Sequence, residues 1–281
     1  MTTIASVNVN GLRAATKNGM HGWLATRQPD VVTLQEVRAP DELVAGLMGD
    51  DWHVVHAEAS AKGRAGVAVA SRLPITAWRR GDDEPCFVGT GRWIEADLTL
   101  PDGTALTVIS AYAHTGDAEV PARMTEKLAF FDAMTARLEV LRATGNEVLL
   151  TGDLNVAHRD IDLKNWKGNI GVAGCHPDER QRFDHWFSEL GWVDVARQLA
   201  GEVPGPYSWW SYRGRAFDTD AGWRIDYHIA TPGLAARAID SSVDRAPSYA
   251  ERWSDHAPVV VNYRDNMPVR GAKKARTSGS K

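Results

Sequence analysis

The sequence predicts an α/β fold in which strands of mixed direction alternate with helices. Three observations support this prediction. Short apolar runs recur along the chain, a tight-turn signal joins two of them, and one long segment repeats its apolar residues at helical spacing. Interleaved strands and helices favour sheets covered by helices, and a hairpin requires that part of a sheet is antiparallel.

The predicted strands are short runs rich in β-branched residues. In chain order they cover Thr3–Val9, Val31–Leu34, Val67–Ala70, Trp93–Leu98, Leu106–Ser110, Val148–Leu150, Ile225–Ala230 and Val259–Val261. Pro101-Asp102-Gly103 is a strong turn signal between two of these runs. We therefore expect Trp93–Leu98 and Leu106–Ser110 to pair as an antiparallel hairpin.

Helical periodicity predicts two helices. Between Pro121 and Gly145 one apolar stripe recurs at spacings of three, four or seven, through Met124, Leu128, Phe131, Leu138 and Leu141. A shorter helix is expected over Asp178–Leu190. Because no Pro/Gly/Ser-rich linker divides residues 1–263, we expect one domain there. Residues 264–281 are basic and poor in apolar residues, which predicts a disordered tail that either aids solubility or contributes to affinity for a polyanion.

Composition restricts the partners and the compartment. The formal net charge is −4, so any affinity for a polyanion must come from a local field rather than from the whole molecule. The two cysteines, Cys86 and Cys175, are too few to staple a secreted fold of this size. The first residues do not resemble a signal peptide, and apolar runs are too short to span a bilayer. We expect a cytoplasmic protein that does not act at membranes.

Two strand ends share a polar pattern. Asn8-Val9-Asn10 and Asp153-Leu154-Asn155 each place a polar residue, a spacer and an Asn after an apolar run. Side chains two residues apart on a strand point the same way, and α/β folds build sites at strand ends. Either pair alone is equally well explained as turn chemistry.

Further acidic residues and a histidine extend this pattern. Glu36 follows the run Val31–Leu34, where a carboxylate suits a hard cation such as Mg²⁺ but could also be merely solvated. Asp255 and His256 precede the last apolar run, and Asp226 lies in another strand-like run. A buried carboxylate beside a histidine keeps the imidazole oriented or charged. A structural histidine is the alternative.

Together these segments resemble the exonuclease III and apurinic/apyrimidinic (AP) endonuclease family, a branch of the wider endonuclease/exonuclease/phosphatase superfamily, over nearly all of residues 3–262. The matching stretches are Ser6–Arg13, Leu34–Val37, Ala111–Tyr112, Gly152–His158, Ile161–Asn165, Lys167–Asn169, Glu179–Gln181, Gly222–Tyr227 and Ser254–Pro258. The resemblance implies a DNase I-like fold, a four-layer sandwich of two mixed β-sheets flanked by helices.

The resemblance also implies a metal site. Glu36 corresponds to the principal Mg²⁺ ligand, aided by Asn10 and Asp255, with Mn²⁺ as a substitute. A second metal near Asp153 and Asn155 stays an open alternative. Animal members of the family have Asp where this chain has Asn10, which implies weaker metal affinity. Thr115 stands where the family usually has Asn or Gln, which puts one phosphate contact in doubt.

Catalytic roles follow from the same resemblance. Asp153 corresponds to the base that takes a proton from the attacking water, and Asn155 to the group that orients that water or stabilises the transition state. His256, paired with Asp226, corresponds to a phosphate-binding imidazole. Tyr112 and Asn8 correspond to residues that contact the phosphate or polarise its neighbours, and Tyr112 as a phenolate nucleophile is a less favoured alternative.

The implied substrate is double-stranded DNA with abasic sites or 3′ ends. Trp209, Trp223 and Ile225 match the apolar wall of a pocket for a flipped-out abasic sugar, whereas Trp210 fits an ordinary core position. Arg213 falls where a relative inserts a side chain into the duplex. The residues expected to touch the DNA backbone are Lys164, Asn165, Lys167 and Asn169.

We therefore expect a monomeric, Mg²⁺-dependent DNA repair nuclease that cuts 5′ to abasic sites and trims 3′ ends as an exonuclease, phosphodiesterase or phosphatase. One alternative is a superfamily phosphatase or phosphodiesterase acting on a substrate other than DNA. Another is a non-catalytic DNA-binding relative. The branch-specific run Gly222–Tyr227 argues against the first, and the presence of Glu36, Asp153 and His256 argues against the second.

Overall fold

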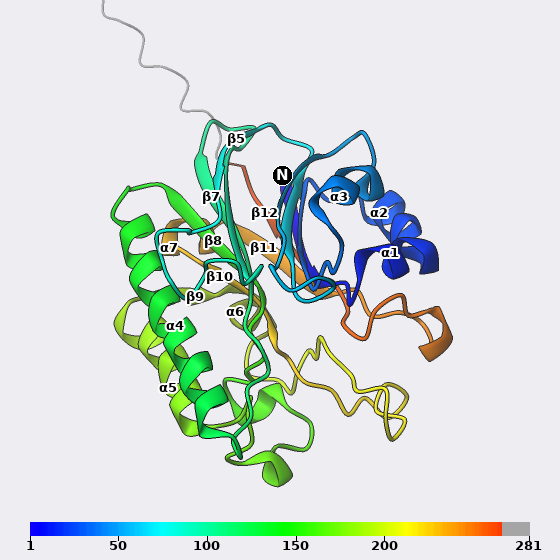
Figure 1. The fold of residues 1–281 in the computed structure, drawn as a ribbon, viewed down its shortest axis with the longest axis vertical. Coiled ribbons are helices and arrows are strands. Elements are labelled where there is room, and N and C mark those ends of the chain that lie inside the picture. The colour runs from blue at the N-terminus through cyan, green and yellow to red at the C-terminus, as the bar shows by residue number, and fades with distance from the viewer. Residues whose placement is uncertain (266–281) are drawn as a thin grey trace, which may run out of the picture.

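A computed structural model describes residues 1–265, and these form two six-stranded sheets (Figure 1). The first sheet has the order β11 (Ala238–Val243), β12 (Val259–Tyr263), β1 (Thr2–Asn8), β2 (Val31–Gln35), β4 (Val67–Ser71) and β3 (His53–Ala57). The second has the order β5 (Ile75–Arg79), β6 (Trp93–Thr99), β7 (Ala105–Tyr112), β8 (Glu147–Asp153), β10 (Asp226–Ala230) and β9 (Val193–Asp194). The predicted basic tail lies, from residue 266 onward, outside the described residues.

Both sheets mix parallel and antiparallel pairs, as predicted. In the first sheet β1 runs parallel to β2 and antiparallel to β12. In the second, β7 runs parallel to β8, whereas β6 and β7 pair antiparallel from Trp93↔Ala111 to Thr99↔Ala105. The expected hairpin is therefore confirmed.

Helices cover the outer faces of both sheets and complete the four layers (Figure 1). On the first sheet lie α1 (Leu12–Ala15), a π-helical turn (Thr16–Met20), α2 (His21–Arg27) and α3 (Asp41–Met48). On the second lie α4 (Pro121–Arg142), α5 (Pro177–Asp184) and a π-helical turn (His185–Glu189). The remaining short elements are α6 (Val195–Ala200), α7 (Pro232–Ala235) and 3₁₀ turns at Asp160–Asp162, Trp166–Asn169 and Tyr249–Glu251. Within residues 1–265, no helix has the length and apolar character needed to cross a membrane.

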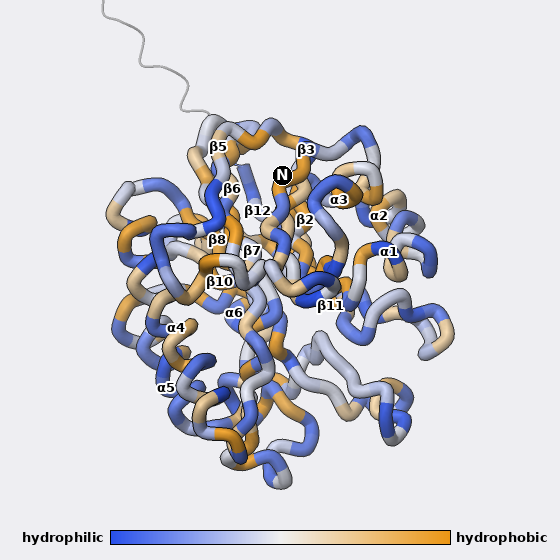
Figure 2. The backbone as a smooth tube through the Cα atoms, viewed as in Figure 1, coloured by the Kyte–Doolittle hydropathy of each residue, from blue (hydrophilic) through white to orange (hydrophobic). Residues whose placement is uncertain are grey.

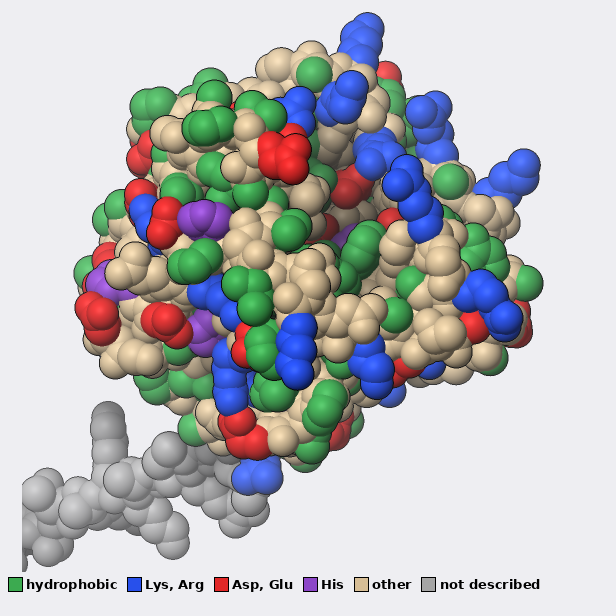
Figure 3. All heavy atoms as spheres, turned by 90° about the horizontal axis from the view of Figure 1, so that it is seen from below, with side chains coloured by type: hydrophobic (Ala, Val, Ile, Leu, Met, Phe, Trp, Pro, Cys, Tyr) green, Lys and Arg blue, Asp and Glu red, His purple; other side chains and the backbone are tan. Residues whose placement is uncertain are grey.

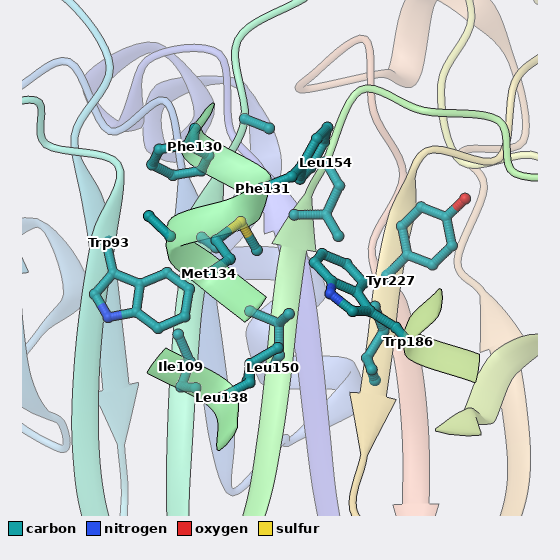
Figure 4. Packing of buried hydrophobic residues seen from close by; sticks show 14 of the residues in the cluster. Trp93, Ile109, Phe130, Phe131, Met134, Leu138, Leu150, Leu154, Trp186 and Tyr227 are labelled. Atoms are coloured by element: carbon teal, nitrogen blue, oxygen red, sulfur yellow. The ribbon is translucent and has the colours of Figure 1, made fainter. Parts of the chain in front are cut away.

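Apolar packing fills the space between the layers, where Figure 2 shows orange stretches along the strands. Figure 4 shows the cluster between α4 and the second sheet, in which Phe131, Met134 and Leu138 face Trp93, Ile109 and Leu150. Strands buried on both faces read as continuous apolar runs, which is why their prediction succeeded.

The predicted helices need two corrections. On α4, Met124, Phe131, Leu138 and Leu141 are buried as expected, but Leu128 is only partly buried and the charged Lys127 takes the buried place beside it. The second predicted helix, Asp178–Leu190, begins at Pro177, and its regular α-helical part ends at Asp184 before the π-helical turn. Proline suits the first helical position because the N–H it lacks would be unpaired there.

Polar side chains join the two sheets inside the sandwich. The hydroxyl oxygens of Thr33 on β2 and Thr151 on β8 lie 2.7 Å apart. Gln35 Nε2 donates to Ser110 Oγ at 3.0 Å, and Ser110 Oγ donates to the carbonyl of Leu34 at 2.9 Å. All of these side chains are buried. A buried hydrogen bond has one satisfied geometry, so these contacts fix how β2 lies against β7 and β8.

A buried ionic network anchors the chain segment that precedes β10. Arg224 contacts Asp162 through Nε at 2.7 Å and Asp194 through Nη2 at 2.7 Å, and Arg197 Nη2 lies 2.5 Å from Asp162. Burial alone would raise the pKa of Asp162, but the two arginines outweigh it and lower that pKa to about 2.

This network predicts a pH-dependent stability. Because the folded-state pKa of Asp162 lies below its unfolded value, its stabilisation is present above about pH 4 and is lost as the pH falls toward 2, an effect of about 2 kcal/mol. Asp162→Asn should lose about 3–5 kcal/mol of unfolding free energy at neutral pH, because Arg197 loses its buried carboxylate partner and Arg224 keeps only Asp194. Urea unfolding of both proteins between pH 2 and 6 is the measurement. An identical acid dependence in wild type and Asp162→Asn would contradict the assignment.

Candidate active site

Site residues from both sheets converge at one end of the sandwich. Asn8 ends β1 and pairs in register with Gln35, which ends β2. Tyr112 ends β7 opposite Asp153, which ends β8, and Asp153 is also paired with Asp226 at the start of β10. The strand ends that the sequence singled out are therefore neighbours in space.

The backbone at these strand ends is unusual. Asn10, Glu36 and Asn155 have φ values of 46°, 49° and 50°, in the left-handed region that residues other than glycine seldom adopt. Gly152 has φ 139°, and a Cβ there would lie 1.9 Å from the carbonyl oxygen of Ala111. Strained backbone of this kind clusters at functional sites, where it aims side chains inward. Gly152 also allows β8 to approach β7 immediately before Asp153.

Asp153 is the centre of the cluster and is 1% exposed. Its Oδ2 accepts hydrogen bonds from Asn8 Nδ2 at 2.9 Å and Asn155 Nδ2 at 3.2 Å, and its Oδ1 accepts the backbone N–H of Asn155 at 3.0 Å. Burial raises the pKa of Asp153, opposed by the charge of His256 and reinforced by Asp226 and Glu36. A carboxylate with a raised pKa can accept a proton from a substrate or a water.

His256 lies on the other side of Asp153. Its Nδ1 is 2.9 Å from Asp226 Oδ2, and its Nε2 is 3.6 Å from Asp153 Oδ2. Burial alone would lower the pKa of His256, but the charges of Asp226 and Asp153 outweigh it and raise the pKa. The imidazole therefore keeps its positive charge at neutral pH, as an anion-binding group requires.

Glu36, Asn10 and Asp255 offer oxygen atoms beside this pair. Asn8 Nδ2 donates to Glu36 Oε1 at 3.0 Å, and Arg38 forms an ion pair with the same carboxylate. Asn10 Nδ2 donates to Asp255 Oδ1 at 2.9 Å. Carboxylate and amide oxygens are the ligands that Mg²⁺ prefers, so this donor set fits a hard cation.

A second group could also hold a metal. Ligand atoms of Asp153, Asp226 and His256 lie within 4.8 Å of one another. A set that includes an imidazole nitrogen suits transition metals better than Mg²⁺. Because His256 already faces two carboxylates, a charged imidazole accounts for the arrangement without an ion.

Several of the site residues line a pocket of about 380 Å³ whose lining is partly acidic and partly apolar. Its polar lining consists of Glu36, Thr115, Asp153, Asn155, Asp255 and His256, and its apolar lining of Val172, Ala173, Trp209, Trp223 and Ile225. The rings of Trp209 and Trp223 meet edge to face with centroids 6.2 Å apart. Figure 3 views the molecule from below, where acidic and histidine side chains lie in a hollow whose surroundings carry Lys and Arg.

Arg213 and the residues expected to touch the DNA backbone do not line the pocket. Arg213, Lys164 and Asn165 are exposed on loops, and the 3₁₀ turn Trp166–Asn169 carries the exposed Lys167 and the partly exposed Asn169. The backbone N–H of Lys164 bonds the carbonyl of Gly222 at 3.1 Å, which ties its loop to the segment that carries Trp223. Trp210 is 2% exposed and packs in a separate apolar cluster, as expected for a core residue.

Tyr112 borders the pocket from a neighbouring groove, which it lines together with Glu36 and Thr115. Burial raises the pKa of Tyr112 far above its usual range, and the charges of Glu36 and Asp153 raise it further. The phenol therefore keeps its proton, which disfavours the phenolate alternative and favours a hydrogen-bond donor.

Sequence reasoning missed two features around the pocket. The neighbouring groove has a volume of about 790 Å³ and is lined by Arg38, Arg64, Arg92 and Arg123. These arginines are scattered through the chain, so no local pattern marked them. The second feature is Lys127, whose charge within the apolar stripe of α4 was the available signal.

Comparison with known proteins agrees with this geometry. A model of the Endonuclease/Exonuclease/phosphatase family matches residues 5–256. The exodeoxyribonuclease of Bacillus subtilis (strain 168) is 35% identical, covering 92% of this chain and 98% of its own length. The DNA repair nuclease APEX1 of Danio rerio is 32% identical, covering 92% of this chain and 81% of its own.

Solved structures show the same fold. An AP endonuclease from Archaeoglobus fulgidus superposes with a TM-score of 0.81 at 28% identity, covering 94% of this chain and 99% of its own. A 3′ phosphatase, NExo, from Neisseria, bound to a product DNA hairpin, gives 0.82 at 29% identity, covering 94% and 100%. The four-layer fold is thereby confirmed, and the chain belongs to the exodeoxyribonuclease III and AP endonuclease branch of the endonuclease/exonuclease/phosphatase family.

Proposed function

We propose that this DNA repair nuclease is Mg²⁺-dependent and hydrolyses the phosphodiester bond on the 5′ side of abasic sites, with additional trimming of 3′ ends. One observation carries the proposal. A buried carboxylate with a raised pKa, Asp153, shares a pocket with an oxygen-rich donor set, a charged imidazole and an apolar wall. Each part supplies one requirement of phosphodiester hydrolysis at a sugar without a base.

Asp153 acts as the general base in this proposal. Its carboxylate lines the pocket and can take the proton of a water aligned with the phosphorus. Asn155 and Asn8 donate hydrogen bonds to Asp153 and so hold its carboxylate in one orientation. The proton moves from the water to Asp153 as the new P–O bond forms and the bond to the 3′ oxygen breaks.

His256 and Tyr112 stabilise the charge that develops on the phosphate. The imidazolium, held by Asp226, faces the non-bridging oxygens, and the protonated phenol of Tyr112 donates a hydrogen bond. Glu36, Asn10 and Asp255 would hold the Mg²⁺ ion, which supplies Lewis-acid stabilisation of the phosphate and of the leaving oxygen. Mn²⁺ has similar ligand preferences and is expected to substitute for Mg²⁺.

The apolar wall selects the abasic sugar. Trp209, Trp223 and Ile225 narrow the pocket, so a deoxyribose without a base fits and a full nucleotide does not. Arg213 and the exposed polar residues of the 164–169 segment contact the flanking duplex in this proposal, because they are accessible to a partner and do not line the pocket. Double-stranded DNA with abasic sites or 3′ ends is the proposed substrate of a monomeric, cytoplasmic enzyme.

A superfamily phosphatase acting on another substrate is the second candidate. The tryptophan wall disfavours it, because phosphate recognition alone needs no large apolar surface beside the donors. The groove with four arginines next to the pocket also favours a long polyanion over a small phosphate ester.

The first functional prediction concerns the metal. Chelation should abolish cleavage of an abasic duplex, and added Mg²⁺ should restore it, because Glu36 can hold a hard cation as part of the oxygen-rich set. Glu36→Ala should need a higher Mg²⁺ concentration for half-maximal rate. Titration of the cleavage rate with Mg²⁺ for both proteins measures this. Full turnover in excess chelator, or an unchanged Mg²⁺ requirement in Glu36→Ala, would reassign the metal ligands.

The second prediction isolates the general base. Asp153→Asn should reduce kcat by about two to four decades while DNA binding stays intact or tightens, because the amide takes no proton and lacks the charge that repels phosphate. Single-turnover cleavage and binding of an abasic duplex give both quantities. Near wild-type turnover in Asp153→Asn would transfer the role of base to another residue.

The third prediction concerns selectivity. Trp223→Ala should enlarge the pocket, lower abasic cleavage and raise the relative rate on nucleotides that bear a base. Relative rates on abasic and undamaged duplexes are the readout. The variant's melting temperature must be checked: truncating a fully buried large ring costs about 3–5 kcal/mol, and the partly buried Trp223 should cost less. Equal reduction of both rates in a folded variant would make Trp223 a scaffold residue.

A further inference from the structure

Lys127 is a charged side chain buried beneath the active-site loops. It is 0% exposed and lies within the apolar stripe of α4. Its Nζ donates to the backbone carbonyls of Thr115 at 2.9 Å and Asn155 at 2.8 Å, and lies 2.5 Å from Glu179 Oε1. Burying an ion pair seldom gains stability over an apolar pair, so its presence here calls for a specific role.

Glu179, the ionic partner of Lys127, binds the loop that precedes α5. Its Oε2 accepts the backbone N–H groups of Gly174 at 2.6 Å and His176 at 3.1 Å. The carbonyl of Gly174 in turn accepts the N–H of Ala157 at 2.8 Å, and a Cβ on Gly174 would lie 3.0 Å from the ring of Trp223. Glu179 therefore fixes the loop that packs against the apolar wall.

Each of the three loops contributes to the pocket. The loop after β7 supplies Thr115, the loop after β8 supplies Asn155, and the loop before α5 supplies Val172 and Ala173. Asn155 Nδ2 also donates to the carbonyl of Ala113 on the β7 loop at 2.9 Å. A relative shift of the two strand-end loops would therefore move the amide that contacts Asp153.

We propose that the Lys127–Glu179 pair positions Asn155 and the pocket wall for catalysis, so that its main contribution is to turnover rather than to folding. The inference rests on the proposed role of Asn155. Lys127 touches no substrate. It holds the backbone carbonyls of Thr115 and Asn155 at a fixed separation, and this separation determines where the Asn155 side-chain amide lies. Lys127→Met keeps the length of the side chain but leaves both carbonyls and Glu179 without their shared donor.

The first experiment measures kcat, KM and melting temperature on an abasic duplex. Lys127→Met should lose about ten- to a hundred-fold in kcat with little change in KM, as expected for a small misplacement of a catalytic group. Glu179→Gln, which keeps an acceptor for both N–H groups, should lose less than Glu179→Ala. Leu138→Ala is the control, because Leu138 is buried on the same helix, about 16 Å further along it. Its melting temperature should fall while kcat is retained.

The second experiment is a double-variant cycle with Asn155→Ala. If Lys127 acts through Asn155, Lys127→Met should cost little further kcat in the Asn155→Ala background. If the kcat losses of Lys127→Met and Asn155→Ala multiply in the double variant, the inference is wrong. It is also wrong if Lys127→Met keeps a kcat as high as that of Leu138→Ala. Neither result would affect the proposed function. Wild-type kcat in Asn155→Ala itself would overturn the proposed role of Asn155 as well. If Lys127→Met does not fold, Glu179→Gln takes its place in the same cycle.

Discussion

The position of one sheet relative to the other is the constraint on which the site depends. Gln35 and Ser110 hydrogen-bond across the sandwich one residue before Glu36 and two before Tyr112, and Thr33 meets Thr151 two residues before Asp153. These buried polar contacts have one satisfied arrangement, whereas the surrounding apolar side chains could repack. A slip of either sheet would leave them unpaired and would separate the metal-binding side of the pocket from the side that carries the base.

Electrostatics then decides what the pocket can do. Glu36, Asp153, Asp226 and Asp255 gather at one end of a protein whose net charge is already −4. Such a cluster repels itself unless positive charge lies among its members, and His256 and Arg38 provide that charge. Burial, reinforced by the same repulsion, raises the pKa of Asp153 and makes it a proton acceptor. Because Asp153, Asp226 and His256 are buried, their mutual interactions are stronger than they would be in water.

Most of the central strands and the site residues at their ends were predictable, because short stretches of sequence mark them. Strands buried on both faces read as apolar runs, and Asn8, Glu36 and Asp153 follow such runs directly. What could not be predicted depends on contacts between distant segments. The edge strands β3, β5, β9 and β11 are short or partly exposed, and helices α1 to α3, α6 and α7 are too short for periodicity to mark them. The link from Lys127 to Thr115 and Asn155, and the groove of arginines, exist only after the chain has folded.

The central claim is that one pocket combines an oxygen-rich metal site, a separate general base and a wall for an abasic sugar. A crystal structure of Asp153→Asn with Mn²⁺ and an abasic duplex tests it most directly, because anomalous scattering locates the metal and density locates the sugar. We predict Mn²⁺ beside Glu36, Asn10 and Asp255, with the sugar against Trp209 and Trp223. Mn²⁺ bound by Asp226 and His256, or a sugar outside the tryptophan wall, would contradict the account.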